Sequence, residues 1–283
     1  MSPTRSPSPL YRLETNVNTP RNHIVSDAFG VTDVGCVRQN NEDALLVRKD
    51  LPLFLVADGV GGAAAGEIAS RLFCEHCAAE FESFLGWSSD HSTLLRRVFT
   101  NANRAILEYT RDHPETKGMA CTAEVLTFIG NDYYLGHVGD SRAYLIRNQQ
   151  ITQITKDHSF VQEQLDLGLI DEEEAKTHWM RNAIYKAVGQ TEDLDIDIVS
   201  GRAASGDLFL LCSDGLSDML EDAEILSILK MPTSLEARVR SLIDAAKRNG
   251  GRDNVTAVVC EVDKITLSQG ISGFAKRLIG AAG

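Results

Sequence analysis

Several aspartates stand where a run of apolar residues ends and a glycine or another small residue follows. Asp58 follows the run 53–57, Asp140 comes just after a run ending at residue 138, and Asp214 closes another. A further aspartate, Asp253, stands directly before the last long apolar run, 254–262. Short apolar runs bounded in this way predict strands, and strand ends in a sandwich gather at the same rim. We therefore expect these carboxylates to converge.

Converging carboxylates can do metal chemistry. They repel each other unless they are protonated or bound to a cation. Ligand sets made only of oxygen suit the hard cations Mg²⁺ and Mn²⁺. An isolated Asp-Gly pair is most simply a hairpin turn. The repetition of the pattern after strongly apolar runs favours a metal site instead.

The segments around these aspartates alternate between strand and helix patterns. Apolar residues recur at helical spacing from Ile68 to Leu85 and from Leu95 to Tyr109, where His113-Pro114 ends the helix. Further helices are predicted for an acidic segment, 158–177, and within 222–248. Connections between strands are mostly hairpin-like, so antiparallel sheets packed with helices are expected rather than a doubly wound parallel sheet. Strands are predicted at 24–31, 43–48, 53–57, 122–129, 132–138, 142–147, 150–154, 195–199, 207–213 and 254–262.

Length and composition indicate one domain. The chain has 283 residues, of which 43% are hydrophobic, enough to bury a sizeable core. Nothing from 23 to 263 has the composition of a linker. Residues 1–22, rich in Ser, Pro, Thr and Asn, predict a flexible tail. Residues 264–283 are expected to form, at most, a short amphipathic helix that packs on the domain rather than on a membrane.

Charge and cysteine usage narrow the partners and the location. The formal net charge of -12 disfavours binding to nucleic acid. The sequence shows neither an apolar run long enough to span a membrane nor a signal-peptide core, so we predict a cytoplasmic location. Six scattered cysteines favour reduced, buried thiols. Cys74 and Cys77 form a C-x-x-C pattern without a second pair, which favours core packing over zinc.

Taken in order, the motifs resemble those of the PP2C-type protein phosphatases (the PPM family) in their compact bacterial form. The similarity spans about residues 24–262, and the number of motifs in the right order makes chance resemblance improbable. The motifs are Arg38-x-x-x-Glu42-Asp43, Asp58-Gly59-Val60-Gly61-Gly62, Gly139-Asp140-Ser141-Arg142, Ser213-Asp214-Gly215-x-x-Asp218 and Arg252-Asp253-Asn254.

The resemblance implies an α+β fold, with a central sandwich of two antiparallel sheets and helices on both outer faces. It also implies a centre of two to three Mn²⁺ or Mg²⁺ ions. Asp58 would bridge two ions, and the Gly59 carbonyl would ligate one of them. Asp214 and Asp253 would complete the protein ligands of the second ion.

Other motif residues would take supporting roles by the same resemblance. Glu42 and Asp43 would hold metal-bound waters from outside the ligand set. Asp140 and Asp218 match positions that bind a third, weaker metal in bacterial members. Arg38 would grip the substrate phosphate, since its planar fork can meet two oxygens together.

These residue types fit the hydrolysis of a phosphate ester by water. Two divalent ions relieve the repulsion of the phosphate oxygens and can lower the pKa of a bound water from about 15.7 to about 7. A covalent cysteine route lacks its parts, because no Cys is followed at the right spacing by an Arg, and a G-x-x-x-x-G-K-[ST] loop is also missing from the sequence.

The sequence departs from the family pattern at two places. Some relatives carry a His after the Asp-Gly turn as proton donor, whereas this chain has alanines at 63–65, so the general acid is unassigned. A metal-bound water or His158 could serve, although a capping or packing role suits His158 better. Cys121 stands where the family often has Thr, and we expect it to be a buried small residue.

One long segment, residues 155–189, resembles the family's flap beside the metal site. Its acidic run, 171–174, reads as a helix N-terminus, where negative charge is favoured by the helix dipole. We expect this variable face, rather than the metal centre, to set specificity for substrate proteins.

The expected function is metal-dependent hydrolysis of phosphoserine and phosphothreonine in proteins, opposing a Ser/Thr kinase, by a monomer. The alternatives are a non-catalytic binding or scaffold module with the same fold and a small-molecule phosphatase. The kinase partner, the substrate and the metal used in the cell are not encoded in any motif.

Overall fold

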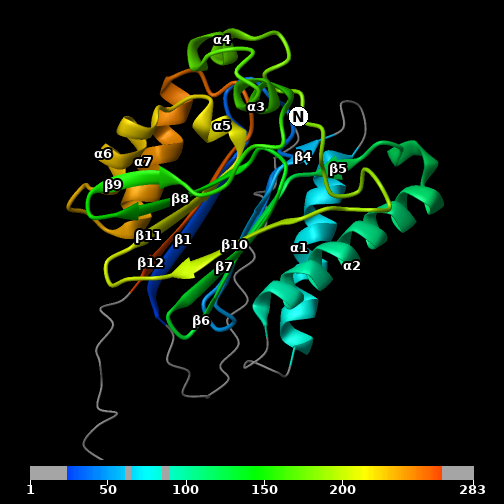
Figure 1. The fold of residues 1–283 in the computed structure, drawn as a ribbon, viewed down its shortest axis with the longest axis horizontal. Helices are drawn as coiled ribbons and strands as arrows, with labels where there is room; N and C mark the ends of the chain where they lie inside the picture. Colours follow the sequence, from blue (N-terminus) through cyan, green and yellow to red (C-terminus); the bar gives the residue numbers. More distant parts are fainter. Residues whose placement is uncertain (1–23, 61–64, 85–89, 263–283) are drawn as a thin grey trace, which may run out of the picture.

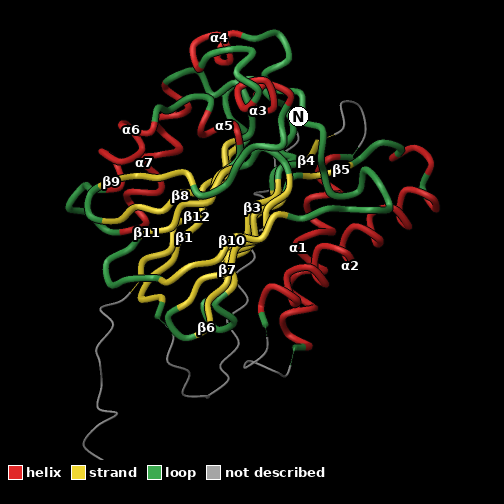
Figure 2. Tube along the Cα trace, viewed as in Figure 1, coloured by secondary structure: helices red, strands yellow, loops and turns green. Residues whose placement is uncertain are grey.

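The computed structural model describes residues 24–60, 65–84 and 90–262, and these form a layered α+β fold. Two sheets lie face to face at the centre, with helices against both outer surfaces (Figures 1 and 2). The two predicted tails, 1–22 and 264–283, lie outside the described residues. The sandwich predicted for this chain is confirmed.

Every neighbouring pair of strands in the two large sheets runs antiparallel. The first sheet has the order β1 (Val25–Asp33), β12 (Val255–Val262), β11 (Leu208–Cys212), β8 (Arg142–Arg147) and β9 (Gln150–Gln153). The second has the order β10 (Asp197–Arg202), β7 (Asp132–Val138), β6 (Ala123–Ile129), β3 (Leu53–Ala57) and β2 (Ala44–Arg48). A short pair, β4 (Gly59–Val60) and β5 (Ala120–Cys121), stands at the rim.

Helices cover each sheet on the side away from its partner. The second sheet is covered by α1 (Gly66–Ser83) and α2 (His91–Asp112), which is followed by a 3-10 turn, η1 (Pro114–Thr116). The first sheet is covered by α6 (Asp222–Leu229) and α7 (Leu235–Arg248). Two short helices, α3 (Phe160–Asp166) and α4 (Glu172–Thr177), lie above the rim, near α5 (Asp214–Ser217) (Figure 1).

Alternation along the strands builds three apolar layers. In β3, Leu53 and Leu55 pack with α1 and α2, whereas Phe54 and Val56 point between the sheets. In β11, Phe209 and Leu211 likewise face the partner sheet, and their neighbours face the helices α6 and α7. Such strands are apolar on both faces because successive side chains point to opposite sides of a sheet that is covered on both.

Local signals set the helix ends. Asp90 caps α2 by accepting a hydrogen bond from the backbone N–H of Ser92 (3.0 Å). Asp171 caps α4, accepting from the N–H of Glu174 (2.8 Å) while the Glu174 carboxylate accepts from the N–H of Asp171 (3.0 Å). The acidic run 171–174 is therefore a helix N-terminus, as predicted.

The structure corrects some boundaries. The segment 158–177 is two short helices rather than one, and the break between them contains Gly168 with a left-handed φ of 65°. The strand expected at 195–199 runs from 197 to 202. Cys36 is exposed, although buried thiols were expected, whereas Cys77 and Cys121 lie in the core. Leu85 lies outside the described residues.

A substitution at Phe99 on α2 tests the apolar layer between the helices and the second sheet. Its ring meets Phe73 edge-on at 5.0 Å and lies over Gly136, where an added Cβ would come within 2.7 Å of the ring. Phe99→Ala should lower the free energy of unfolding by about 3–5 kcal/mol, because the ring is fully buried and would leave a cavity.

Urea denaturation measures this loss. Thr100→Ala, on the exposed side of the same helix, is the matched control and should change stability by less than about 0.5 kcal/mol. Equal effects of the two substitutions would contradict this assignment of the core.

Candidate metal centre

Asp58 leaves β3 at the rim and is held there by Thr122. The backbone N–H of Asp58 donates to Oγ1 of Thr122 (3.0 Å), and the N–H of Thr122 donates to the Asp58 carbonyl (2.8 Å). Oγ1 of Thr122 also lies 2.7 Å from Oγ of Ser141, the residue after Asp140. A buried hydroxyl pair thus ties the end of β3 to the turn after β7.

The glycines beside Asp58 and Asp214 serve close packing rather than hairpin turns. A Cβ on Gly59 would lie 2.4 Å from backbone atoms of Gly66, at the start of α1. A Cβ on Gly215 would lie 1.9 Å from the carbonyl oxygen of Asn254. Gly59 begins β4, and Gly215 lies in the first turn of α5. Only glycine lets these backbones approach so closely.

Asp43 lies beneath the rim, where two hydroxyls from remote segments meet it. Its Oδ2 accepts hydrogen bonds from Oγ of Ser213 (2.8 Å) and Oγ1 of Thr256 (2.6 Å). Its Oδ1 is buried without a hydrogen-bond partner among the described residues. Burial raises the pKa of Asp43 to about 6, although the two hydroxyls oppose that shift.

The carboxylates of the rim act on one another. Burial first, and then the charges of Asp43, Asp214, Asp140 and Asp253, raise the pKa of Asp58 well above its usual value. The pKa of Asp214 is raised in the same way, by burial and by its acidic neighbours. Burial and the nearby Asp157 raise the pKa of Asp140 to about 7. The predicted convergence of these groups is therefore seen in their electrostatics.

The carboxylates lie close enough to affect one another's pKa values, but they are not arranged as a complete set of metal ligands. Among the described residues, His, Cys, Asp and Glu side chains do not come together in threes at metal-binding spacing. The donor set nevertheless fits a hard cation, since all the converging groups are carboxylates. Oδ1 of Asp214 is buried and lacks a hydrogen-bond partner within the described part of the chain, which leaves a carboxyl oxygen for a cation.

Arg38 and Asp253 form a pair at the open side of the centre. Nη2 of Arg38 lies 2.7 Å from Oδ2 of Asp253, and this contact raises the pKa of Arg38. Asn254 holds the loop that carries Arg38, because its Nδ2 donates to the Asn40 carbonyl (2.8 Å). Its Oδ1 accepts from the backbone N–H of Glu42 (2.8 Å).

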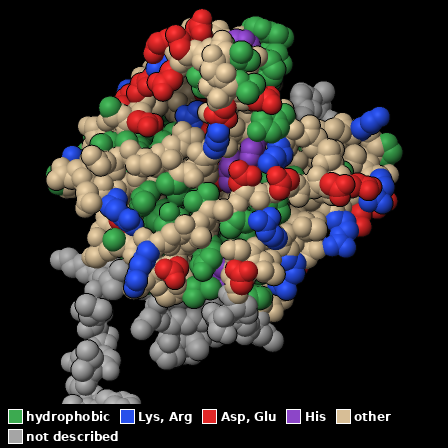
Figure 3. Space-filling view, viewed as in Figure 1, with side chains coloured by type: hydrophobic (Ala, Val, Ile, Leu, Met, Phe, Trp, Pro, Cys, Tyr) green, Lys and Arg blue, Asp and Glu red, His purple; other side chains and the backbone are tan. Residues whose placement is uncertain are grey.

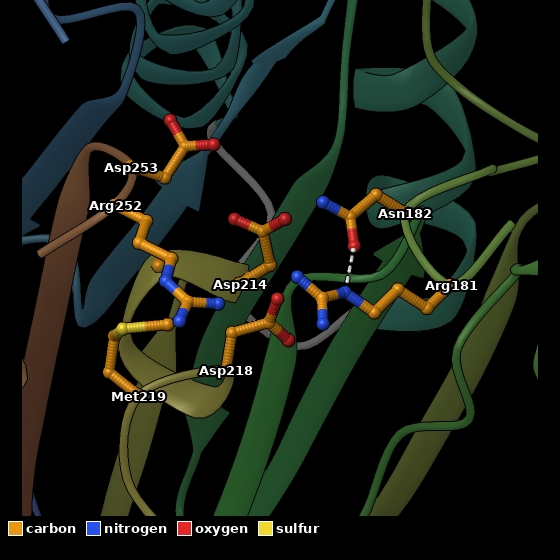
Figure 4. Close-up of a pocket in the computed structure, with 8 residues that line it drawn as sticks. Arg181, Asn182, Asp214, Asp218, Met219, Arg252 and Asp253 are labelled. Atoms are coloured by element: carbon orange, nitrogen blue, oxygen red, sulfur yellow. Dashed lines mark hydrogen bonds between the residues drawn. The ribbon is translucent and has the colours of Figure 1, made fainter. Parts of the chain in front are cut away.

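A pocket opens beside these carboxylates and is closed on one side by the flap, which we define as residues 155–189. Asp214 and Asp218 lie between Arg252 on one side and Arg181 of the flap on the other (Figure 4). Burial raises the pKa of Asp218, and the charge of Arg181 partly opposes that rise. Acidic side chains gather over α4, the part of the flap farthest from the sheets (Figure 3).

Sequence reasoning found the carboxylates but missed the groups that hold them. Its motifs contained Ser213 and Asn254, and Thr122 was noted only as part of a departure from the family pattern. Thr256, inside the last strand, carried no signal other than a polar residue in an apolar run. The predicted metal roles of Asp58, Gly59, Asp214, Asp253, Asp140 and Asp218, and the outer roles of Glu42 and Asp43, stay predictions.

The fold recurs in known proteins. Residues 37–257 match the family model described as "Protein phosphatase 2C". The chain belongs to the protein phosphatase 2C family. Its resemblance to this family, inferred from the motifs, is confirmed, and so is the fold.

Individual family members are similar along most of the chain. Serine/threonine protein phosphatase PstP of Mycobacterium tuberculosis is 42% identical over 231 residues, which cover 82% of this chain but 44% of that protein. The chain thus spans less than half the length of PstP. Serine/threonine phosphatase stp of Listeria monocytogenes is 33% identical over 237 residues, covering 82% of this chain and 94% of that protein.

Solved structures agree with this family membership. The catalytic domain of PstP in complex with 2 manganese ions has a TM-score of 0.77 and 38% identity, covering 84% of this chain and 98% of that chain. Stp1 from Staphylococcus aureus has a TM-score of 0.80 and 32% identity, covering 87% of this chain and 100% of that one. In this phosphatase 2C chain, as described here, none of the helices is long and apolar enough to span a membrane.

The raised carboxyl pKa values predict how stability depends on pH when no metal is added. The pKa of an aspartate in the unfolded chain is about 4. Between that pH and about pH 7, the folded chain therefore keeps protons at Asp43 and Asp140 that the unfolded chain has lost. These groups therefore lower the free energy of unfolding as pH rises through that window. Asp140→Asn should stabilise the protein in EDTA at pH 8, by on the order of 2 kcal/mol, and much less at pH 5.

Urea titrations at both pH values measure this difference. Asp193→Asn, at an exposed aspartate that does not line the pocket beside the carboxylates, serves as control and should behave as wild type at each pH. A stabilisation by Asp140→Asn that is equal at pH 5 and pH 8 would show that charge repulsion is not its cause.

Proposed function

We propose that this chain is a metal-dependent protein phosphatase that hydrolyses phosphoserine and phosphothreonine in proteins. The observation that carries the proposal is the set of partly buried aspartates, drawn from remote segments, whose charges raise one another's pKa values at one rim. A fold maintains such repulsion at a cost in stability, and a cation that binds there removes the cost. Membership of the protein phosphatase 2C family supports the same conclusion.

The cofactor proposed is two to three Mn²⁺ or Mg²⁺ ions. Asp58, the Gly59 carbonyl, Asp214 and Asp253 would hold two of them, and Asp140 and Asp218 a third. The complex of PstP with manganese ions supports manganese as one candidate. When bound, such ions would lower the pKa of a shared water and neutralise charge on the phosphate.

The protein's own groups would orient and hold the substrate. Arg38, about half exposed, keeps its charge at all working pH values and would exchange Asp253 for phosphate oxygens. Glu42 and Asp43 would accept hydrogen bonds from ordered water; Asp43 has a free Oδ1 for this purpose. The flap and Arg252 line the pocket, and a phosphopeptide would approach the carboxylates between them.

The alternatives are less well supported. A non-catalytic scaffold would not need to retain every motif carboxylate, yet Asp58, Asp140, Asp214, Asp218 and Asp253 are all present. For a small-molecule phosphatase we would expect an enclosed pocket, whereas the carboxylates here lie at an open rim beside the flap. The proposed partners are therefore phosphorylated proteins and, indirectly, the Ser/Thr kinases that modify them. We propose further that the protein acts as a monomer in the cytoplasm.

Removing a bridging carboxylate should abolish metal-dependent turnover. Asp58→Asn is expected to lower kcat for p-nitrophenyl phosphate with Mn²⁺ by about 10³-fold or more, because the ion pair would lose its shared ligand. Arg38→Lys should keep kcat within about tenfold and raise KM, since one ammonium replaces a two-pronged contact.

Two comparisons complete the test. Asp193→Asn should match wild type, and phosphopeptides carrying phosphoserine or phosphothreonine should have a kcat/KM above that of small phosphate metabolites. Turnover that survives both EDTA and Asp58→Asn would overturn the proposed function.

A further inference from the structure

His158 stands at the base of the flap, where the chain enters and leaves it. The carbonyl of His158 accepts a hydrogen bond from the backbone N–H of Tyr185 (3.0 Å), and Ser159 pairs with Ile184 as an antiparallel bridge. The first and last parts of the flap are thus held together at this point. A displacement of His158 would therefore move both the first and the last part of the flap.

His158 also makes two hydrogen bonds to the backbone of Gly139, the residue before Asp140. Its backbone N–H donates to the Gly139 carbonyl (2.7 Å), and the Gly139 N–H donates to Nδ1 of the His158 ring (3.0 Å). Gly139 has a φ of 110°, a conformation that glycine adopts readily and other residues disfavour. The next residue is Asp140, a predicted ligand of the third metal.

The His158 ring is buried and oriented by a second histidine. It stacks on His137, with centroids 4.5 Å apart and planes inclined by 26°. His137 contacts Glu124 through Nδ1, and its Nε2 donates to the Lys156 carbonyl (2.8 Å). Burial lowers the pKa of His137, but Glu124 outweighs it and raises that pKa to about 9. Burial also raises the pKa of Glu124, to about 7, so the pair holds at least one proton at neutral pH.

The remaining ring atom of His158 is also engaged. Nε2 lies 3.4 Å from Oδ2 of Asp197 on β10 and 3.2 Å from Nζ of Lys186. Because Nδ1 accepts the Gly139 N–H, the ring is neutral and its proton is on Nε2, directed toward Asp197. His158 is 4% exposed and is not among the residues that line the pocket beside the carboxylates. This geometry does not suit a proton donor to a leaving group.

The residue before His158 holds the other end of the same turn. Asp157 accepts hydrogen bonds from Nε and Nη2 of Arg142, its Oδ2 lying 3.0 and 2.8 Å from them. The turn 139–142, which presents Asp140, is therefore hydrogen-bonded to His158 at one end and to Asp157 at the other. Both of these residues belong to the entry of the flap.

We propose that His158 is a positioning residue that fixes Asp140 for metal binding and couples its place to that of the flap. The inference rests on the proposed function, since it concerns how that centre is assembled. It assigns to His158 a contact with the Gly139 backbone instead of the role of general acid. Loosening this contact should weaken metal binding at Asp140 and raise KM for substrates that touch the flap.

Two substitutions separate this role from simple packing. In His158→Asn, Oδ1 stands near the former position of Nδ1 and can still accept the Gly139 N–H. In His158→Leu, the volume is retained but the acceptor is lost. His113→Leu, a half-buried histidine after α2 that stacks on Tyr109, is the control.

The first readout needs no enzyme activity. In full-length protein with Mn²⁺, the Gly139 amide should exchange with deuterium at least about tenfold faster in His158→Leu than in wild type, and be protected again in His158→Asn. The Mn²⁺ concentration for half of the metal-induced shift in Tm should rise by about 10-fold in His158→Leu and return to within about 3-fold in His158→Asn. Unchanged exchange at Gly139, or equal losses in both variants, would overturn the inference.

The second readout uses turnover. His158→Leu should raise KM for a phosphopeptide by more than it lowers kcat for p-nitrophenyl phosphate at saturating Mn²⁺. A loss of kcat of about 10²-fold or more, equal in both variants, would identify a general acid instead and refute the positioning role. If wild-type protein shows no phosphatase activity, the proposed function fails, while the exchange and Tm measurements still decide the role of His158.

Discussion

Carboxylates at one rim of the sandwich repel one another, and the rest of the structure must hold them together against that repulsion. Asp58 and Asp214 are surrounded by other acids, and burial strengthens each interaction because little water screens it. Left to themselves, these groups would separate or take up protons. The two sheets, each covered by helices and packed on the other, hold the strand ends in place against that force.

Fine positioning comes from short polar side chains. Thr122 fixes the backbone of Asp58, Ser213 and Thr256 fix the carboxylate of Asp43, and Asn254 fixes the loop that carries Arg38 and Glu42. All of these polar residues are buried. A buried polar group that finds its partner stabilises one arrangement, and one that loses it is costly. The segments that carry the carboxylates are therefore held by buried hydrogen bonds.

The flap gives the same rim a second surface. Its base is tied to the metal-site turn through His158 and Asp157, whereas its outer part carries the acidic cap of α4 and exposed Leu167, Leu169 and Trp179. The base is thus hydrogen-bonded to the turn that presents Asp140, and the outer part presents acidic and apolar side chains to solvent. This division suits an enzyme whose chemistry is constant and whose protein substrates vary.

Much of this was encoded locally and could be predicted from the sequence. Apolar runs predicted most strands, aspartates at the ends of those runs predicted the carboxylate rim, and the order of the motifs predicted the family. The partners of the site residues could not be predicted. Asp43 meets Thr256 across 213 positions of sequence, and His158 meets Gly139 across 19. Periodicity reports which face of an element is buried, but only the packed sheets decide which side chains meet at their ends, because hydrogen bonds depend on distance in space.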